Sequence, residues 1–127
     1  MTDHKSFSFR FPRDPKTVRS ARGALAGMND GLPPARLYDA SLCLAELVSN
    51  AVRHPREAGD VDLTIAMAED RLRVEVADPG HGFEIEPPGN GREGGWGLQI
   101  VDRLADGWGI EAGERTVVWF EILRAPD

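Results

Sequence analysis

Residues 45–54 of the chain read Ala-Glu-Leu-Val-Ser-Asn-Ala-Val-Arg-His, and they close a long predicted helix. This helix opens at Pro33-Pro34 and ends near His54, because Pro55 cannot continue it. Its apolar residues recur three or four positions apart, as in a helix that buries one face: Leu37, Ala40, Leu44, Leu47, Val48 and Ala51. We therefore expect this helix to pack against the core.

Glu46 and Asn50 lie four residues apart in this stretch, so both belong to one face of the helix, beside its apolar stripe. A carboxylate and an amide oxygen at the border of a core suit magnesium, which prefers oxygen ligands and retains waters. A solvated helix edge without a chemical role has the same spacing. The pair is a candidate site that needs support from other residues.

Strand and helix patterns surround the long helix. Before it, residues 7–11 alternate phenylalanine with polar residues as in a strand, and Asp14-Pro15 predicts the start of a helix that residues 29–31 stop. After it, residues 61–67 and 72–76 alternate as the two strands of an antiparallel hairpin. Both sides of the long helix thus carry strands with one buried face.

The second half of the chain begins with a long segment, residues 79–95, that has no usable periodicity and is rich in glycine. A loop of this length inside a compact domain is usually functional or mobile. A short helix follows, and residues 108–112 and 116–123 form the last two strands, in which we expect Trp108 and Trp119 to be core residues. The order of elements predicts an α+β fold, a two-layer α/β sandwich with a mixed, mostly antiparallel sheet covered on one face by helices.

Composition narrows the functional classes. The 127 residues fit a single domain, 1–127, and the net charge of −6 argues against a nucleic-acid surface, which needs a basic patch. Cys43 is the only cysteine, so no disulfide forms within the chain. The absence of an apolar stretch of about 20 residues and of a signal-peptide core predicts a cytoplasmic protein without a membrane span.

A second motif, Asp78-Pro79-Gly80-His81-Gly82, directly follows a predicted strand. A carboxylate at a strand end is placed to accept a hydrogen bond from a ligand amine, and Gly80 and Gly82 let the backbone approach a flat ligand closely. A plain turn is the alternative, because Asp-Pro-Gly is also a good turn sequence.

A third motif, Gly94-Gly95-Trp96-Gly97-Leu98, stands at the start of the short helix. Free N–H groups at a helix start bind anions, and glycines permit close approach of a phosphate. No Gly-Lys-Ser/Thr follows, so this is not a Walker A loop, and no strand precedes it as in a dinucleotide-binding fold. A flexible hinge is the alternative.

The order of the three motifs is more specific than any one of them. A helical Glu-x-x-x-Asn, then Asp-x-Gly-x-Gly after a strand, then Gly-x-Gly before a helix resembles the N, G1 and G2 boxes of the GHKL ATPases, of the histidine kinase and Hsp90 type. In finer detail, residues 45–54, 97–106 and 116–121 look like the anti-sigma-factor serine kinases of that superfamily. The resemblance runs from Phe7 to Leu123.

This resemblance implies an ATP site with magnesium. Asn50 would coordinate the metal ion, and Glu46 would be the general base for an incoming serine hydroxyl. Asp78 would accept the adenine amino group, supported by Thr116, directly or through water. The glycines of the second motif, Gly80 and Gly82, would shape the adenine pocket. The third motif would close over the phosphates as part of a lid at about 79–97, through Gly94, Gly95, Trp96, Gly97 and Leu98.

The resemblance also implies partners. An anti-sigma-factor kinase binds a sigma factor and phosphorylates a serine on its anti-anti-sigma antagonist, and a homodimer through the first strand and helix is a further family expectation. Two alternatives remain: a non-catalytic module whose ATP-bound lid controls protein docking, and a stand-alone histidine-kinase catalytic domain. The intact Glu46 favours the serine kinase.

Overall fold

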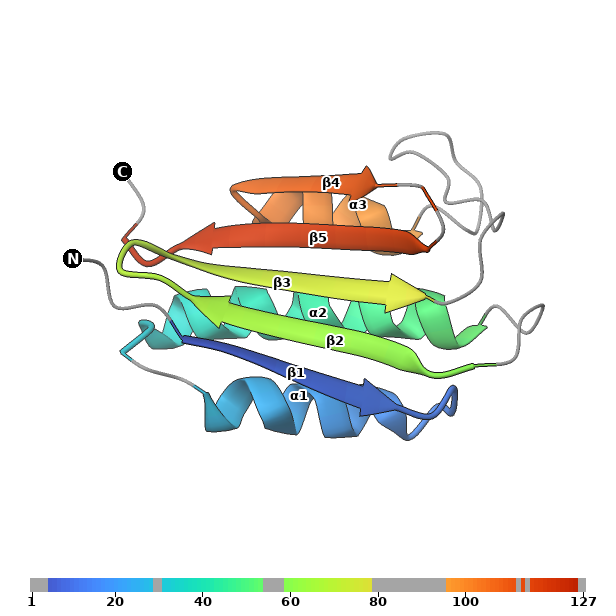
Figure 1. Cartoon of the computed structure of the whole chain (residues 1–127). Coiled ribbons are helices and arrows are strands. Elements are labelled where there is room, and N and C mark those ends of the chain that lie inside the picture. Colours follow the sequence, from blue (N-terminus) through green and yellow to red (C-terminus); the bar gives the residue numbers. More distant parts are fainter. Residues whose placement is uncertain are drawn as a thin grey trace.

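The computed structural model describes residues 5–28, 31–53, 59–78, 96–111, 113 and 115–125. These residues form a five-stranded sheet in the order β1-β2-β3-β5-β4, with the helices on one of its faces (Figure 1). The elements are β1 (Lys5–Phe11), α1 (Thr17–Gly27), α2 (Pro34–Arg53), β2 (Val61–Met67), β3 (Arg71–Asp78), α3 (Trp96–Leu104), β4 (Gly107–Glu111) and β5 (Thr116–Leu123). The predicted α+β sandwich is confirmed.

Every pairing between the described strands is antiparallel, so the sheet is antiparallel throughout rather than mixed. The pairing of β2 with β3 is the predicted hairpin. β5 follows β4 in the sequence but lies between β4 and β3, and it pairs with both of them. The central strands β2, β3 and β5 alternate buried and half-buried residues, as expected for a sheet with one covered face.

Helix α2 lies at the centre of the helical layer, in contact with α1 and α3 on its sides and with β2, β3 and β5 below. Most of its predicted apolar stripe is buried, and Leu37 packs half-buried against the same core. The strands contribute the opposite side of this core, with Leu63, Val74 and Phe120 wholly buried. None of the helices in the described ranges is long and apolar enough to cross a membrane.

Helix α1 begins at Thr17, two residues later than the Asp14-Pro15 pattern predicts. The Asp14 carboxylate accepts a hydrogen bond from the backbone N–H of Lys16 at 2.8 Å, and its carbonyl accepts one from that of Thr17 at 2.9 Å. Pro15 and Lys16 therefore form a turn that leads into the helix. Asp14 does organise the helix start, but from outside the first helical turn.

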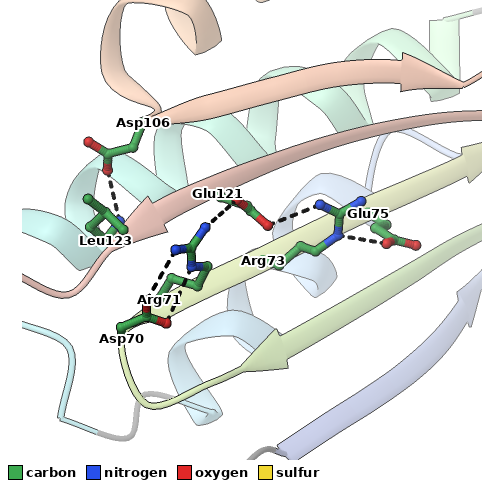
Figure 2. Close-up of polar contacts among 7 residues, drawn as sticks. All are labelled: Asp70, Arg71, Arg73, Glu75, Asp106, Glu121 and Leu123. Atoms are coloured by element: carbon green, nitrogen blue, oxygen red, sulfur yellow. Dashed lines mark hydrogen bonds and ion pairs between the residues drawn. The ribbon is translucent and has the colours of Figure 1, made fainter.

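The face of the sheet without helices carries a network of charged side chains (Figure 2). The guanidinium of Arg71 bridges Asp70 and Glu121, and that of Arg73 bridges Glu75 and Glu121, all at 2.9–3.1 Å. Because these pairs are half-exposed, each adds little to the free energy of unfolding. Together these side chains place positive and negative charges side by side on the open face of β3 and β5.

Trp119 belongs to this open face, so its prediction as a core residue is wrong. It lies between Val118 and Phe120, whose side chains point to the helices, and strand alternation places it on the other side. Its indole ring packs under the Arg73 guanidinium, 4.2 Å from the ring centroid. Trp108, by contrast, is half-buried against the core, and its Nε1 donates to Asp102 at 2.8 Å.

Gly109 of β4 lies directly opposite Trp119, and this contact predicts a glycine requirement. A Cβ at position 109 would stand 2.8 Å from Trp119 Nε1, whereas one at Gly107 would stand 3.9 Å from the same ring. We expect Gly109→Ala to lower the free energy of unfolding by about 1–3 kcal/mol, because the ring must shift from its place under Arg73. Gly107→Ala is the matched control and should change it by less than about 1 kcal/mol. Urea denaturation measures the free energy of unfolding of both variants. Equal effects of the two substitutions would contradict the close approach of position 109 to Trp119.

The Cys43 thiol is wholly buried in α2. Burial raises the pKa of this thiol from 9.0 to about 12, and the nearby Asp39 carboxylate makes a smaller contribution in the same direction. The folded state holds the thiol proton more tightly than the unfolded state, so the protonated thiol contributes to the free energy of unfolding. This contribution is full below pH 9.0 and is lost as the pH rises towards 12. Since only the thiolate reacts, we expect iodoacetamide to modify the native chain at pH 8 roughly 100-fold more slowly than the urea-unfolded chain. Mass spectrometry gives both rates, and similar rates would refute the buried thiol.

Candidate functional site

The predicted polar row of α2 runs from the core to the solvent. Cys43 is buried, Glu46 and Asn50 are half-buried, and Arg53 is exposed at the helix end. Arg53 Nη2 donates to Asn50 Oδ1 at 3.3 Å. Within the described part of the chain, no hydrogen bond or ion pair engages the Glu46 carboxylate. Glu46 is therefore an acceptor at the border of the core, one turn before Asn50.

Asp78 ends β3 and lies opposite Thr116, the first residue of β5. Both side chains are on the helix-covered face, and they are the buried polar residues of the sheet, with 2% and 6% of their surface exposed. The alternation that buries Val74 and Val76 also turns Asp78 inward. A carboxylate and a hydroxyl thus face the end of α2 from two adjacent strands.

A small cavity joins these residues. Its volume is ≈ 10 Å³, room for about one water, and it is lined by Leu47, Asn50, Ala51, Val76, Asp78, Leu98, Thr116 and Val118. Four sequence-predicted site residues therefore converge from α2, β3, α3 and β5. The remaining walls are aliphatic, so the cavity sets a few polar groups among apolar side chains.

Arg13 is the residue of this region that sequence reasoning missed. Its Nη1 donates to Asp78 Oδ2 at 3.0 Å and its Nη2 to Asp78 Oδ1 at 2.9 Å, which makes a two-pronged ion pair. Nη1 also donates to the carbonyl oxygen of Ala51 at 2.7 Å. A buried carboxylate at position 78 requires a partner, but nothing in the spacing of the chain distinguishes Arg13 from its other basic residues.

Several predicted site residues lie outside the described residues: Gly80, Gly82, Gly94 and Gly95, with the greater part of the predicted lid. Trp96 and Gly97 form the first turn of α3, as the third motif predicts. Leu98 follows them and is wholly buried, next to the cavity. In the described ranges, no group of three or more His, Cys, Asp and Glu side chains could hold a metal ion.

Comparison with known proteins identifies the family of the chain. The model of the histidine kinase-like ATPase domain matches residues 11–122. Among curated relatives, the serine-protein kinase RsbW of Bacillus licheniformis is 30% identical over 113 residues, which cover 75% of this chain and 71% of that protein. The RsbW of Oceanobacillus iheyensis is 27% identical over 124 residues, 84% of this chain and 78% of the relative.

A solved structure shares the fold. The crystal structure of the RsbU and RsbW domains of a Mycobacterium tuberculosis protein superposes with a TM-score of 0.71 at 20% identity. The match covers 96% of this chain and 33% of that one. The fold and the family match agree, and the chain belongs to the histidine kinase-like ATPase domain family.

Proposed function

We propose that this chain is an ATP-dependent protein serine kinase of the anti-sigma-factor type, folded as one ATPase domain over 1–127. The observation that carries the proposal is the cavity in which Asn50, Asp78 and Thr116 meet, with Glu46 one helical turn away. The curated relatives are named serine-protein kinases, which supports the same activity here.

Asp78 and Thr116 recognise the adenine ring. Asp78 accepts a hydrogen bond from the 6-amino group, and Thr116 supports it directly or through water, because the two side chains are adjacent on β3 and β5. The aliphatic walls formed by Leu47, Val76 and Val118 suit the faces of the ring. Gly80 and Gly82 let the backbone pass close to the base, because they carry no side chain.

Asn50 holds the metal and the phosphates. Asn50 lines the cavity, and its Oδ1 is a hard oxygen ligand, which suits a magnesium ion that would take one or two protein ligands and complete its shell with water and phosphate. When bound, magnesium neutralises charge on the phosphates. Residues 94–98, the last three of which begin α3, offer backbone N–H groups to the same phosphates as part of the lid.

Glu46 is the general base. It removes the proton from a partner's serine Oγ as that oxygen bonds to the γ-phosphorus, the bond from phosphorus to the β,γ-bridging oxygen breaks, and ADP leaves. A carboxylate suffices when the hydroxyl is within hydrogen-bond reach. Glu46 fits because no described residue engages it in an ion pair.

The partners follow from the same proposal. The chain binds a sigma factor and phosphorylates a serine on the anti-anti-sigma antagonist, in the cytoplasm, where ATP is available. A homodimer through β1 and α1 belongs to the proposal, and exposed Phe7 on the edge strand β1 offers it an apolar contact. The second candidate is a non-catalytic module in which ATP controls docking, and it predicts ATP binding without transfer.

The first test of the proposal is nucleotide binding. Mg-ATP at 100 times its Kd should stabilise the native chain by about 2.7 kcal/mol, seen as a thermal shift. Asp78→Asn should remove most of that shift, because an amide presents a donor as well as an acceptor to the adenine edge. Asp62→Asn is the matched control, since Asp62 pairs with Arg10 and Arg115 away from the cavity. An unchanged shift in Asp78→Asn would contradict the adenine assignment.

The second test is transfer. With labelled Mg-ATP and a cytoplasmic extract of the source organism, the chain should label a serine on a partner protein, located by phosphosite mapping. Glu46→Ala should reduce the rate of labelling at least ~100-fold while ATP affinity is kept. Glu111→Ala changes an exposed carboxylate at the end of β4 and should label normally. Normal labelling by Glu46→Ala would show that the base is misassigned; ATP binding without any labelling by the native chain would favour the docking module.

A further inference from the structure

The face of α2 that points away from the sheet carries no charged residue. Each residue of this outward row stands two positions before a residue of the buried stripe, about 200° around the helix: Tyr38, Leu42, Ala45 and Ser49. None of these side chains is buried, and Tyr38 is 63% exposed. The outward row is therefore an uncharged surface along the central helix.

The charged residues of α2 lie on another side of the helix. Asp39, Glu46 and Arg53 recur at seven-residue steps and share one side, and Arg36 joins Asp39 to Asp106, which follows α3. A helix at the surface of a domain usually turns its charged residues to water, opposite its core face. The outward row departs from this pattern, although α2 belongs to a single layer of helices and no described helix or strand covers it (Figure 1).

A groove between α1 and α2 borders the outward row. Its volume is ≈ 300 Å³. The apolar residues that line it come from both helices: Leu25, Ala26, Pro34, Leu37 and Tyr38. Tyr38 thus belongs to the outward row and to the groove, so an apolar side chain that entered the groove would also contact the row.

The α1 side of the groove is positively charged. Residues 15–28 contain Lys16, Arg19 and Arg22 and no Asp or Glu. These three side chains line an open hollow of ≈ 820 Å³ beside α1, and Arg22 lines the groove as well. Arg22 Nε donates to the hydroxyl of Ser41 at 3.0 Å, and among the described residues no carboxylate pairs with any of the three side chains. Positive charge without a counter-charge is thus gathered here, in a chain whose net charge is −6.

We propose that the outward row and the groove beside it bind an acidic amphipathic helix of a partner protein. The apolar face of that helix covers the row and fills the groove at Tyr38, and its carboxylates face the three cations of residues 15–28. The row runs from Tyr38 to Ser49, about 16 Å at 1.5 Å per residue, which matches about three turns of a partner helix. Helices that bind in grooves anchor apolar side chains three or four residues apart, as the row itself is spaced. The proposal does not depend on the ATP site.

The test uses a display library of helical peptides of about 18 residues, five turns. Leucine stands at helical spacing in every member, and the other positions vary among glutamate, glutamine and lysine. Selection on the native chain should enrich glutamate over lysine, because the cations beside the groove lack counter-charges. The most enriched peptide is then synthesised, and fluorescence anisotropy gives its Kd for the native chain and for four variants.

Two variants test the apolar contact. Tyr38→Ala should raise the Kd about tenfold or more, because a few aromatic anchors supply most of the affinity of such interfaces. Ile110→Ala is the matched control, since it removes another exposed apolar side chain, 39% exposed, from β4. It should change the Kd by less than about twofold.

Two variants test the charge. Arg22→Gln should raise the Kd about threefold or more at low salt. The effect should largely disappear in 1 M salt, where charges are screened beyond about 3 Å. Arg103→Gln, which changes an exposed arginine in the last turn of α3, is the matched control and should bind as the native chain does. All four substitutions change exposed side chains, and circular dichroism verifies that the variants fold.

Each result supports or overturns the proposal. Selection that enriches lysine, or that enriches no sequence, would overturn it. So would a selected peptide that binds Tyr38→Ala as tightly as the native chain, or one that loses equal affinity in Tyr38→Ala and Ile110→Ala. Sedimentation velocity tests a second copy of the chain as the occupant: a dimer of the native chain that Tyr38→Ala dissociates would assign this surface to self-association and overturn the partner helix. None of these outcomes affects the proposed ATP site.

Discussion

The contact between the apolar stripe of α2 and the centre of the sheet determines the rest of the molecule. Leu44, Leu47 and Val48 meet the covered faces of β2, β3 and β5, so α2 cannot rotate without exposing them. That fixed rotation places Glu46 and Asn50 at the border of the core, with Asn50 beside the cavity that Asp78 and Thr116 also line. The chemistry of the site is therefore a consequence of how one helix is buried.

Most of the fold was predictable because its signals are local and periodic. One buried face is predicted by the alternation in residues 61–67 and 72–76, and another by the helical spacing before residue 53. The structure confirms both. Trp119 shows where this reasoning fails. Large aromatic residues are usually buried, but strand parity places this ring on the open face, where Gly109 and Arg73 give it a surface to pack on. Hydrophobicity suggested a core residue, whereas the alternation of Val118 and Phe120 already indicated the opposite face.

The site was predictable in its parts and less so in its assembly. The three motifs pointed to Asn50, Asp78 and Leu98, and the structure brings these residues to one cavity. Arg13 could not be found, because its bond to Asp78 spans 65 residues of sequence and depends on the path of the chain after β1. Local patterns identify the carboxylate, while the cation that balances it is determined by tertiary structure.

The position of β5 has a consequence for how the chain comes to be folded. β5 is translated after β4 but lies between β4 and β3, so β3 and β4 do not pair with each other and both pair with β5. The pairings of β2 with β3 and of β4 with β5 join neighbouring strands of the sequence and are local. The pairing of β3 with β5 joins strands that are far apart in the sequence, and such non-local pairing is slow. Thr116 comes to lie opposite Asp78 only when that pairing forms. A nascent chain would thus form the hairpin of β2 and β3 before Thr116 completes the lining of the cavity beside Asp78.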